Sequence, residues 1–137
     1  MAEPLKAFAA TKPIYGTCAG AILVAREVTS PRQFSFGLID IDIERNAYGR
    51  QVDSSIRRLD PEQEFIDRTG PGKLEAIFIR APIIHRLGEG VRVLIQDEGT
   101  PVLVEQGNML AGSFHPELTA DRRAHQLFLD KVSKSTR

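Results

Sequence analysis

The chain has 137 residues, the length of a single domain, with 42% hydrophobic and 26% charged residues, as in ordinary globular proteins. Its 18 basic residues balance its 18 acidic ones, which argues against a nucleic-acid partner and an anionic membrane surface. A single cysteine excludes an internal disulfide. With no signal peptide and no apolar run near the roughly twenty residues of a membrane span, we expect a cytoplasmic protein.

The first third of the sequence predicts a helix, a strand, a second helix and a second strand. Apolar residues at helical spacing over residues 5–9 predict a short helix that ends before Lys12-Pro13. A brief strand then leads into Cys18, and the apolar run over residues 21–28 predicts a helix behind it. Residues 36–44 alternate between isoleucines and acids, which is more typical of a half-solvated antiparallel insertion than of a buried central strand.

The middle of the sequence continues the alternation. Asp60-Pro61-Glu62 resembles a helix start with proline at the first helical position. Residues 74–79 predict a short apolar strand closed by Pro82, and residues 91–95 alternate like a further strand.

The last third predicts a hairpin and a helix. Residues 101–105 and 108–114 are strand-like and are joined by a short turn that contains glycine. After Asp121, apolar residues recur at helical spacing, which predicts an amphipathic C-terminal helix. The order of the elements indicates an α/β fold.

Gly16-Thr17-Cys18-Ala19-Gly20 places the only cysteine between small residues, after a predicted strand and before a predicted helix. Small neighbours let a strand turn sharply into a helix and leave the central side chain exposed, as in a nucleophile elbow. The helix N-terminus behind Cys18 would favour the thiolate, which is the attacking species. A buried structural cysteine is an equally good interpretation of this segment taken alone.

His115-Pro116-Glu117 follows the last predicted strand. Pro116 biases His115 toward extended geometry, and residues two apart in an extended segment point the same way. We therefore expect His115 and Glu117 to share a face, as a general base and its orienting carboxylate require. Taken alone, His115 is as well interpreted as a partnered structural histidine, and Glu117 as a solvated carboxylate. One cysteine combined with a His-x-Glu spacing favours catalysis.

Four segments together resemble one protein family. They are Gly16-Thr17-Cys18-Ala19-Gly20, Arg45-Asn46-Ala47-Tyr48-Gly49-Arg50-Gln51, Phe78-Ile79-Arg80-Ala81-Pro82 and Ser113-Phe114-His115-Pro116-Glu117-Leu118. Over residues 12–128 the chain resembles the glutaminase subunits of pyridoxal 5'-phosphate synthase, which are class I, triad-type glutamine amidotransferases. The first and last segments are shared by amidotransferases generally, whereas the second and third point to the vitamin B6 branch.

The resemblance implies an α/β, flavodoxin-like sheet of the class I glutamine amidotransferase type, with helices on both faces. In that family, two strand–helix units and a Gly-Gly-Glu-Ser loop precede the elbow. We therefore expect residues 1–137 to form a single, partial amidotransferase domain that lacks its first strand–helix units, about sixty residues. The missing loop would supply one backbone donor to the oxyanion and Ala19 the other, and losing one donor costs about a hundredfold in rate.

The resemblance also implies the catalytic roles. Cys18 attacks the side-chain carbonyl of glutamine, His115 moves the proton to the leaving ammonia, and Glu117 orients the imidazole. Water then cleaves the γ-glutamyl thioester to release glutamate. No bound cofactor is implied, because pyridoxal phosphate is the product of the pathway. No metal is expected either, because the histidines and the cysteine lack metal-ligand spacing.

By the same resemblance, Arg45, Ile79 and Arg80 lie beside the bound glutamine, where a guanidinium suits an α-carboxylate. From the residues alone, Arg45 is better interpreted as a solvated strand-end residue. Arg80 is likewise better interpreted as the ion-pair partner of an acid such as Glu75 or Asp97.

The resemblance implies a protein partner as well. Ammonia passes to a separate (β/α)8-barrel synthase subunit, so we expect a heteromeric complex. Tyr48 and Arg50 are expected to stabilise a turn or to contact that subunit. His85 and His125 lie outside the matched segments, where solvated or capping roles are expected.

Three functional hypotheses follow from the sequence. The chain is a glutaminase subunit, or a catalytically inactive remnant that at most binds the synthase subunit, or a cysteine hydrolase of another branch with the same elbow. The third hypothesis gives no role to residues 46–51. Release of glutamate with the synthase subunit present distinguishes the first two.

Overall fold

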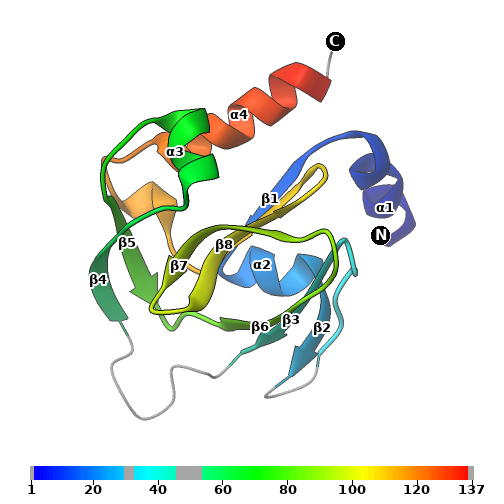
Figure 1. Ribbon diagram of the computed structural model, residues 1–137. Helices are drawn as coiled ribbons and strands as arrows, with labels where there is room; N and C mark the ends of the chain where they lie inside the picture. Colours follow the sequence, from blue (N-terminus) through cyan, green and yellow to red (C-terminus); the bar gives the residue numbers. More distant parts are fainter. Residues whose placement is uncertain (1, 30–32, 46–53, 136–137) are drawn as a thin grey trace.

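A computed structural model of the chain describes residues 2–29, 33–45 and 54–135 (Figure 1). In chain order, its elements are α1 (Ala2–Thr11), β1 (Ile14–Thr17), α2 (Ala19–Val24), β2 (Ala25–Thr29), β3 (Ile39–Glu44), β4 (Ser54–Leu59), α3 (Gln63–Thr69), β5 (Leu74–Ile79), β6 (Ile83–Leu87), β7 (Arg92–Asp97), β8 (Thr100–Gln106), β9 (Met109–Gly112), a 3-10 turn η1 (Pro116–Leu118) and α4 (Arg123–Ser135). Among these elements, no helix combines the length and the apolar character needed to span a membrane.

A four-stranded sheet in the order β1-β9-β8-β7 positions the candidate site. β1 and β9 are parallel, with Thr17 opposite Gly112, and β7, β8 and β9 follow one another as antiparallel hairpins. Because β1 and β9 run in the same direction, the residues that follow them, Cys18 and Ser113, come out at the same edge of the sheet. Two segments almost a hundred residues apart are thereby brought together.

Helices cover both faces of this sheet. On one face, Gly16 of β1 lies against Gly20 in the first turn of α2. On the other, the ring of Tyr15 packs on Phe128 of α4, with the ring centroids 5.9 Å apart. Figure 1 shows α3 and α4 beside each other, on the side of the sheet away from α2. The alternation of side chains along β1 therefore separates the two layers.

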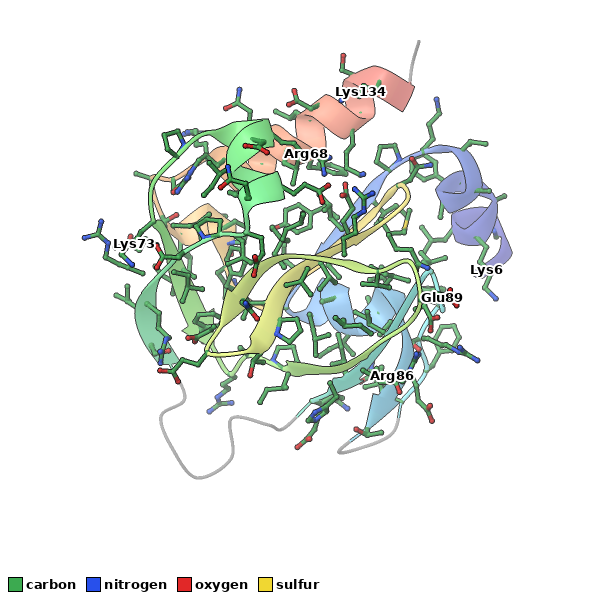
Figure 2. All side chains as sticks on the ribbon, in the orientation of Figure 1. Lys6, Arg68, Lys73, Arg86, Glu89 and Lys134 are labelled. Atoms are coloured by element: carbon green, nitrogen blue, oxygen red, sulfur yellow. The ribbon has the colours of Figure 1, made fainter. Side chains whose placement is uncertain are left out.

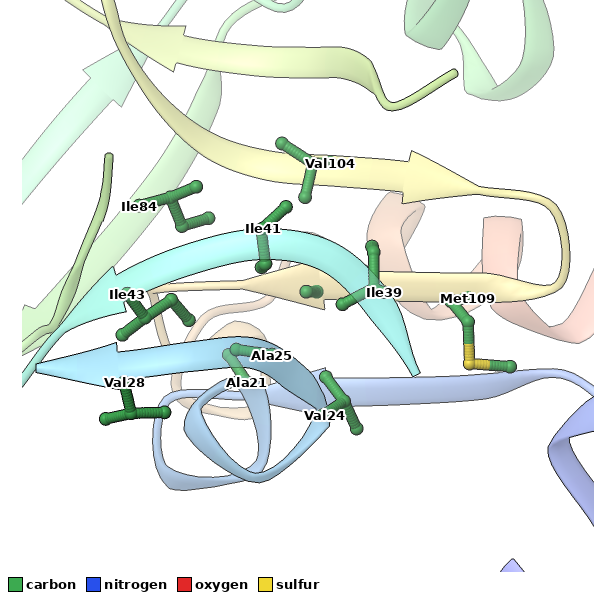
Figure 3. Packing of buried hydrophobic residues seen from close by; sticks show 11 residues of the cluster. Ala21, Val24, Ala25, Val28, Ile39, Ile41, Ile43, Ile84, Val104 and Met109 are labelled. Carbon is green, nitrogen blue, oxygen red and sulfur yellow. The ribbon is translucent and has the colours of Figure 1, made fainter. Parts of the chain in front are cut away.

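Two apolar clusters correspond to these layers. The first joins α2, β2 and β3 to β8 and β9, and Figure 3 shows Ile41 of β3 between Val104 of β8 and Ala25 of β2. The second lies on the other face and joins α3, β5 and α4 to the sheet through Phe65, Phe114 and Leu127. All three of these side chains are at most 1% exposed, so both helices are anchored by burial of apolar surface.

A buried ion cluster ties the second layer to the sheet. Glu105 of β8 is 6% exposed and accepts hydrogen bonds from Arg68 Nη1 at 2.7 Å, from Arg68 Nη2 at 3.1 Å and from Lys131 Nζ. Figure 2 shows Arg68 between α3 and α4. Burial raises the pKa of Glu105, but the hydrogen bonds and positive charges of Arg68 and Lys131 outweigh it and leave that pKa below the usual value.

Most of the predicted elements are confirmed. The first helix, the strand into Cys18, the strand over residues 74–79, the last hairpin and the C-terminal helix all form. The alternation after residue 36 is also confirmed, because the isoleucines of β3 are buried and its acids are half-buried. β3 pairs antiparallel with β6 but parallel with β2, so it is the central strand of a three-stranded sheet rather than an antiparallel insertion.

Three local predictions are wrong. Residues 21–28 do not form one helix, because α2 ends at Val24 and β2 begins at Ala25, where it pairs with β3. Pro61 is not the first helical residue; it bridges to Ile95, and α3 starts at Gln63. The strict alternation over residues 91–95 fails because the register shifts there and two consecutive side chains of β7 are buried. In each case strand pairing overrides the local pattern.

Candidate active site

Cys18 occupies a sharp elbow between β1 and α2. Its φ of 49° and ψ of −107° lie in a region that side-chain-bearing residues rarely adopt, and its N–H donates to the carbonyl of Gly112 at 2.9 Å. The tight approach depends on Gly16, because a Cβ there would stand 2.6 Å from the carbonyl oxygen of Gly20. The predicted elbow geometry is therefore present.

Burial controls the protonation of Cys18. The residue is 9% exposed, and its Sγ contacts the carbonyl oxygen of Ser113 at 3.4 Å. Burial raises the pKa of the thiol to about 11, and the negative charge of Glu117 acts in the same direction. Burial and the charge of Glu117 therefore favour the neutral thiol, against the expected preference for the thiolate.

His115 and Glu117 form a direct pair. The Nδ1 of His115 and the Oε2 of Glu117 are 2.7 Å apart. Desolvation opposes ionisation of Glu117, but the hydrogen bond from His115 and the positive charges of His115 and His125 leave its pKa below the usual value. When the ring is neutral, the carboxylate accepts the Nδ1 proton, and Nε2 is the ring nitrogen that can accept another.

The geometry behind this pair differs from the expected one. His115 is extended, with φ −101° and ψ 92°, but residues 116–118 form the turn η1 instead of continuing the strand. Pro116 starts this turn at its first position, as its fixed φ allows. The turn folds Glu117 back onto His115, so the expected contact forms although the expected extended segment does not.

A backbone hydrogen bond to β5 and a contact between Cys18 and Ser113 hold the two halves of the site. The backbone N–H of His115 donates to the carbonyl of Ile77 in β5 at 2.8 Å, and Cys18 contacts Ser113, two residues before His115. The charge of Glu117 reaches the Cys18 thiol, as the rise in its pKa requires. Cys18 and the His115–Glu117 pair therefore lie on the two segments that leave the same edge of the sheet, after β1 and β9.

The residues expected to bind substrate lie in different places. Ile79, at the end of β5, is 42% exposed, and Arg80 follows it with a φ of 44°. Both lie a few residues beyond the carbonyl that anchors His115. Arg45 follows β3 in the three-stranded sheet, where its N–H donates to the carbonyl of Thr29 at 2.9 Å. Tyr48 and Arg50, expected to stabilise a turn or to contact the partner, lie outside the described residues.

The structure also places three other residues named from the sequence, Ala19, Asp97 and His85. Ala19 is the exposed first residue of α2, and backbone N–H groups in a first helical turn have no partner within the helix. Asp97, one proposed partner of Arg80, pairs with Arg57 at 2.8 Å. His85 pairs with Glu44 at 2.5 Å on β6 and β3. Over the described ranges, no group of three or more His, Cys, Asp or Glu residues is suited to hold a metal ion.

Sequence reasoning missed Tyr15. Among the described residues, its hydroxyl is the one buried side-chain polar atom without a hydrogen-bond partner. Burial raises the pKa of this phenol strongly, and the charges of Cys18 and Glu117 raise it further. A tyrosine in the strand that leads into the elbow, three residues before the predicted nucleophile, was the available signal.

Comparisons with known proteins identify the family. Residues 1–134 match the family model described as the SNO glutamine amidotransferase family. The chain belongs to the SNO glutamine amidotransferase family. It is 61% identical over 125 residues to pyridoxal 5'-phosphate synthase subunit PdxT of Solibacter usitatus. This match covers 91% of this chain and 65% of the relative. It is 50% identical over 130 residues to the PdxT of Koribacter versatilis, covering 95% of this chain and 65% of the relative. The chain thus spans just under two thirds of these relatives' length.

Solved structures support the same assignment. This chain is 43% identical to a glutamine amidotransferase of known crystal structure, with a TM-score of 0.84. The match covers 96% of this chain and 68% of that protein. A glutamine amidotransferase from Thermotoga maritima has a TM-score of 0.57, and the match covers 98% of this chain and 55% of that protein. At 14% identity, this match shows similarity of fold alone. The fold is therefore that of class I glutamine amidotransferases, as expected.

Proposed function

We propose that this chain is the glutaminase part of a pyridoxal 5'-phosphate synthase, which hydrolyses L-glutamine to L-glutamate and ammonia. One observation carries the proposal. A cysteine on a strained elbow and a paired histidine and glutamate follow two neighbouring parallel strands at the same edge of the sheet, which supports a shared site. That arrangement supplies a nucleophile, a base and an orienting carboxylate for acyl transfer.

The reaction begins with a protonated thiol. His115 Nε2 accepts the proton of Cys18 as sulfur attacks the amide carbon, which gives a tetrahedral oxyanion. The N–H of Ala19 is proposed to donate to that oxyanion. His115 then gives its proton to the nitrogen, the C–N bond breaks, and ammonia leaves a γ-glutamyl thioester. Water, activated by His115, cleaves the thioester and restores the thiol.

Substrate binding is assigned to three further residues. Arg45 is proposed to bind the α-carboxylate of glutamine through its guanidinium. Ile79 and Arg80 extend from the end of β5 past the carbonyl that anchors His115, and we assign them to the flank of the substrate.

The released ammonia implies a second subunit that uses it as a substrate. We propose that the chain acts in the cytoplasm with the (β/α)8-barrel synthase subunit, which incorporates ammonia into pyridoxal 5'-phosphate. The names of the PdxT relatives support this partner.

Glutamate release from glutamine, measured with the synthase subunit present, tests the proposal. Cys18→Ala should reduce the rate by about four orders of magnitude or more, and His115→Asn by a similar factor. His85→Asn is the matched control, because His85 is also paired with a glutamate but lies on another sheet. Equal rates for Cys18→Ala and the unchanged chain would refute the proposal.

A second candidate function is a non-catalytic module that binds the synthase subunit. The buried, protonated state of Cys18 favours it, because a thiol with a pKa of about 11 is a poor nucleophile until a base engages it. Binding to the synthase subunit without glutamate release would support this candidate.

A further inference from the structure

We propose that Tyr15 is a positioning residue for the nucleophile Cys18. Its buried hydroxyl donates a hydrogen bond to the Cys18 thiolate when Cys18 gives up its proton. The proposal rests on the function proposed above. It adds a residue that none of the four family-like segments contains.

The position of the Tyr15 hydroxyl is the first argument. The hydroxyl lies 3.5 Å from the point where a Cβ on Gly112 would stand. Gly112 is the residue whose carbonyl accepts the N–H of Cys18, and Ser113, which follows it, contacts the Cys18 sulfur. The Tyr15 hydroxyl therefore lies beside Gly112, one of the two residues that hold the nucleophile.

The unpartnered state of the hydroxyl is the second argument. Leaving a buried hydroxyl without an acceptor costs on the order of 1–3 kcal/mol, whereas phenylalanine would fill the same space without that cost. The ring is already held by its contact with Phe128. The hydroxyl is therefore retained at a cost in stability, as expected of a group whose acceptor forms only when charge develops nearby.

The charged surroundings identify that acceptor. The titratable groups nearest in the fold are Cys18, which follows β1, His115 and Glu117, which follow β9, and His125 of α4, whose charge acts on Glu117. The charges of Cys18 and Glu117 both raise the pKa of the phenol, and of these two groups only Cys18 acquires its charge when it loses its proton. Hydrogen bonds to ionised groups are about twice as strong as neutral ones, so a donor here stabilises the thiolate more than the thiol.

The test measures thiolate formation directly. Cys18 is the only cysteine, so the rate of alkylation by iodoacetamide, followed by mass from pH 7 to 11, reports its protonation. For Tyr15→Phe we expect the profile to move about one unit higher, which makes alkylation about tenfold slower at each pH below the midpoint. Phe128→Leu is the matched control, because it disturbs the ring contact and keeps the hydroxyl.

Each outcome decides the question. A shifted profile in Tyr15→Phe, with an unshifted one in Phe128→Leu, supports the proposal. An unchanged or faster profile overturns it, and so does an equal shift in both variants, which would indicate packing alone. Tyr15→Phe should be at least as stable as the unchanged chain in urea; failure to fold would show a structural bond and would also overturn the proposal. Alkylation needs no glutamine, so a silent glutaminase assay with a shifted profile would refute the proposed function alone.

Discussion

The elbow makes a sharp prediction about two glycines four residues apart. Replacing Gly16 by alanine puts a Cβ 2.6 Å from the Gly20 carbonyl oxygen, 2.7 Å from its carbon and 3.0 Å from the nitrogen of Ala21. All three atoms belong to the backbone, so no side chain can rotate away. The start of α2 has to retreat by roughly 0.8 Å to reach ordinary van der Waals separation. We expect Gly16→Ala to lower the free energy of unfolding by about 2–3 kcal/mol.

Gly20→Ala is the matched control. A Cβ at Gly20 meets no atom within 4 Å, and the residue lies within α2. Alanine in a helix is favoured over glycine by up to about 1 kcal/mol, so this variant should be neutral or slightly stabilised. The same chemical change is thus expected to destabilise the chain at position 16 but not at position 20.

Urea unfolding followed by circular dichroism measures both variants, and alkylation of Cys18 reports whether the elbow has moved. A displaced α2 should expose the buried thiol and accelerate its alkylation in Gly16→Ala only. Equal stabilities for the two variants would refute the reasoning, because the close approach of β1 and α2 would then carry no energetic weight.

Three further predictions concern charge and substrate. Because burial raises the pKa of Cys18 from 9.0 to about 11, the buried neutral thiol contributes fully to stability below pH 9, and this contribution is lost as the pH rises through 11. Over that interval the free energy of unfolding, measured in urea titrations, should fall by about 2 kcal/mol more for the unchanged chain than for Cys18→Ala. Glu105→Gln leaves two cations without their buried carboxylate and should cost about 2–4 kcal/mol by thermal or urea unfolding, whereas Asp60→Asn, which breaks an exposed pair with Lys73, should cost less than about 1 kcal/mol. Arg45→Ala should raise the KM for glutamine about tenfold or more while kcat changes little, measured as glutamate release with the synthase subunit; an unchanged KM would remove Arg45 from the substrate site.

The sequence was sufficient for features fixed by local pattern. The alternation of isoleucine and acid along β3 determines which face is buried, and the glycines around Cys18 indicate a turn that only small residues allow. The last hairpin was predictable because Gly107, with a φ of 56°, occupies its turn.

Features set by distant partners were not predictable. Val28 continues an apolar run that looks helical, yet it joins β2 because β3 provides a strand to pair with. The thiol of Cys18 looks activated by the helix behind it, but its protonation is determined by burial and by Glu117, almost a hundred residues away. Sequence spacing correctly paired His115 with Glu117 through an incorrect backbone geometry.

Glu117 has two opposite effects on the formation of the Cys18 thiolate. With Glu117 bound to Nδ1, His115 is oriented to accept a proton, but the same carboxylate raises the pKa of Cys18. Removing Glu117 therefore has two opposed effects, because it frees the imidazole to rotate and it makes the thiolate easier to form. We expect Glu117→Gln to speed the alkylation of Cys18 at pH 8 while it slows glutamine hydrolysis. A variant that slowed both reactions would show that Glu117 acts on the thiol only through the histidine.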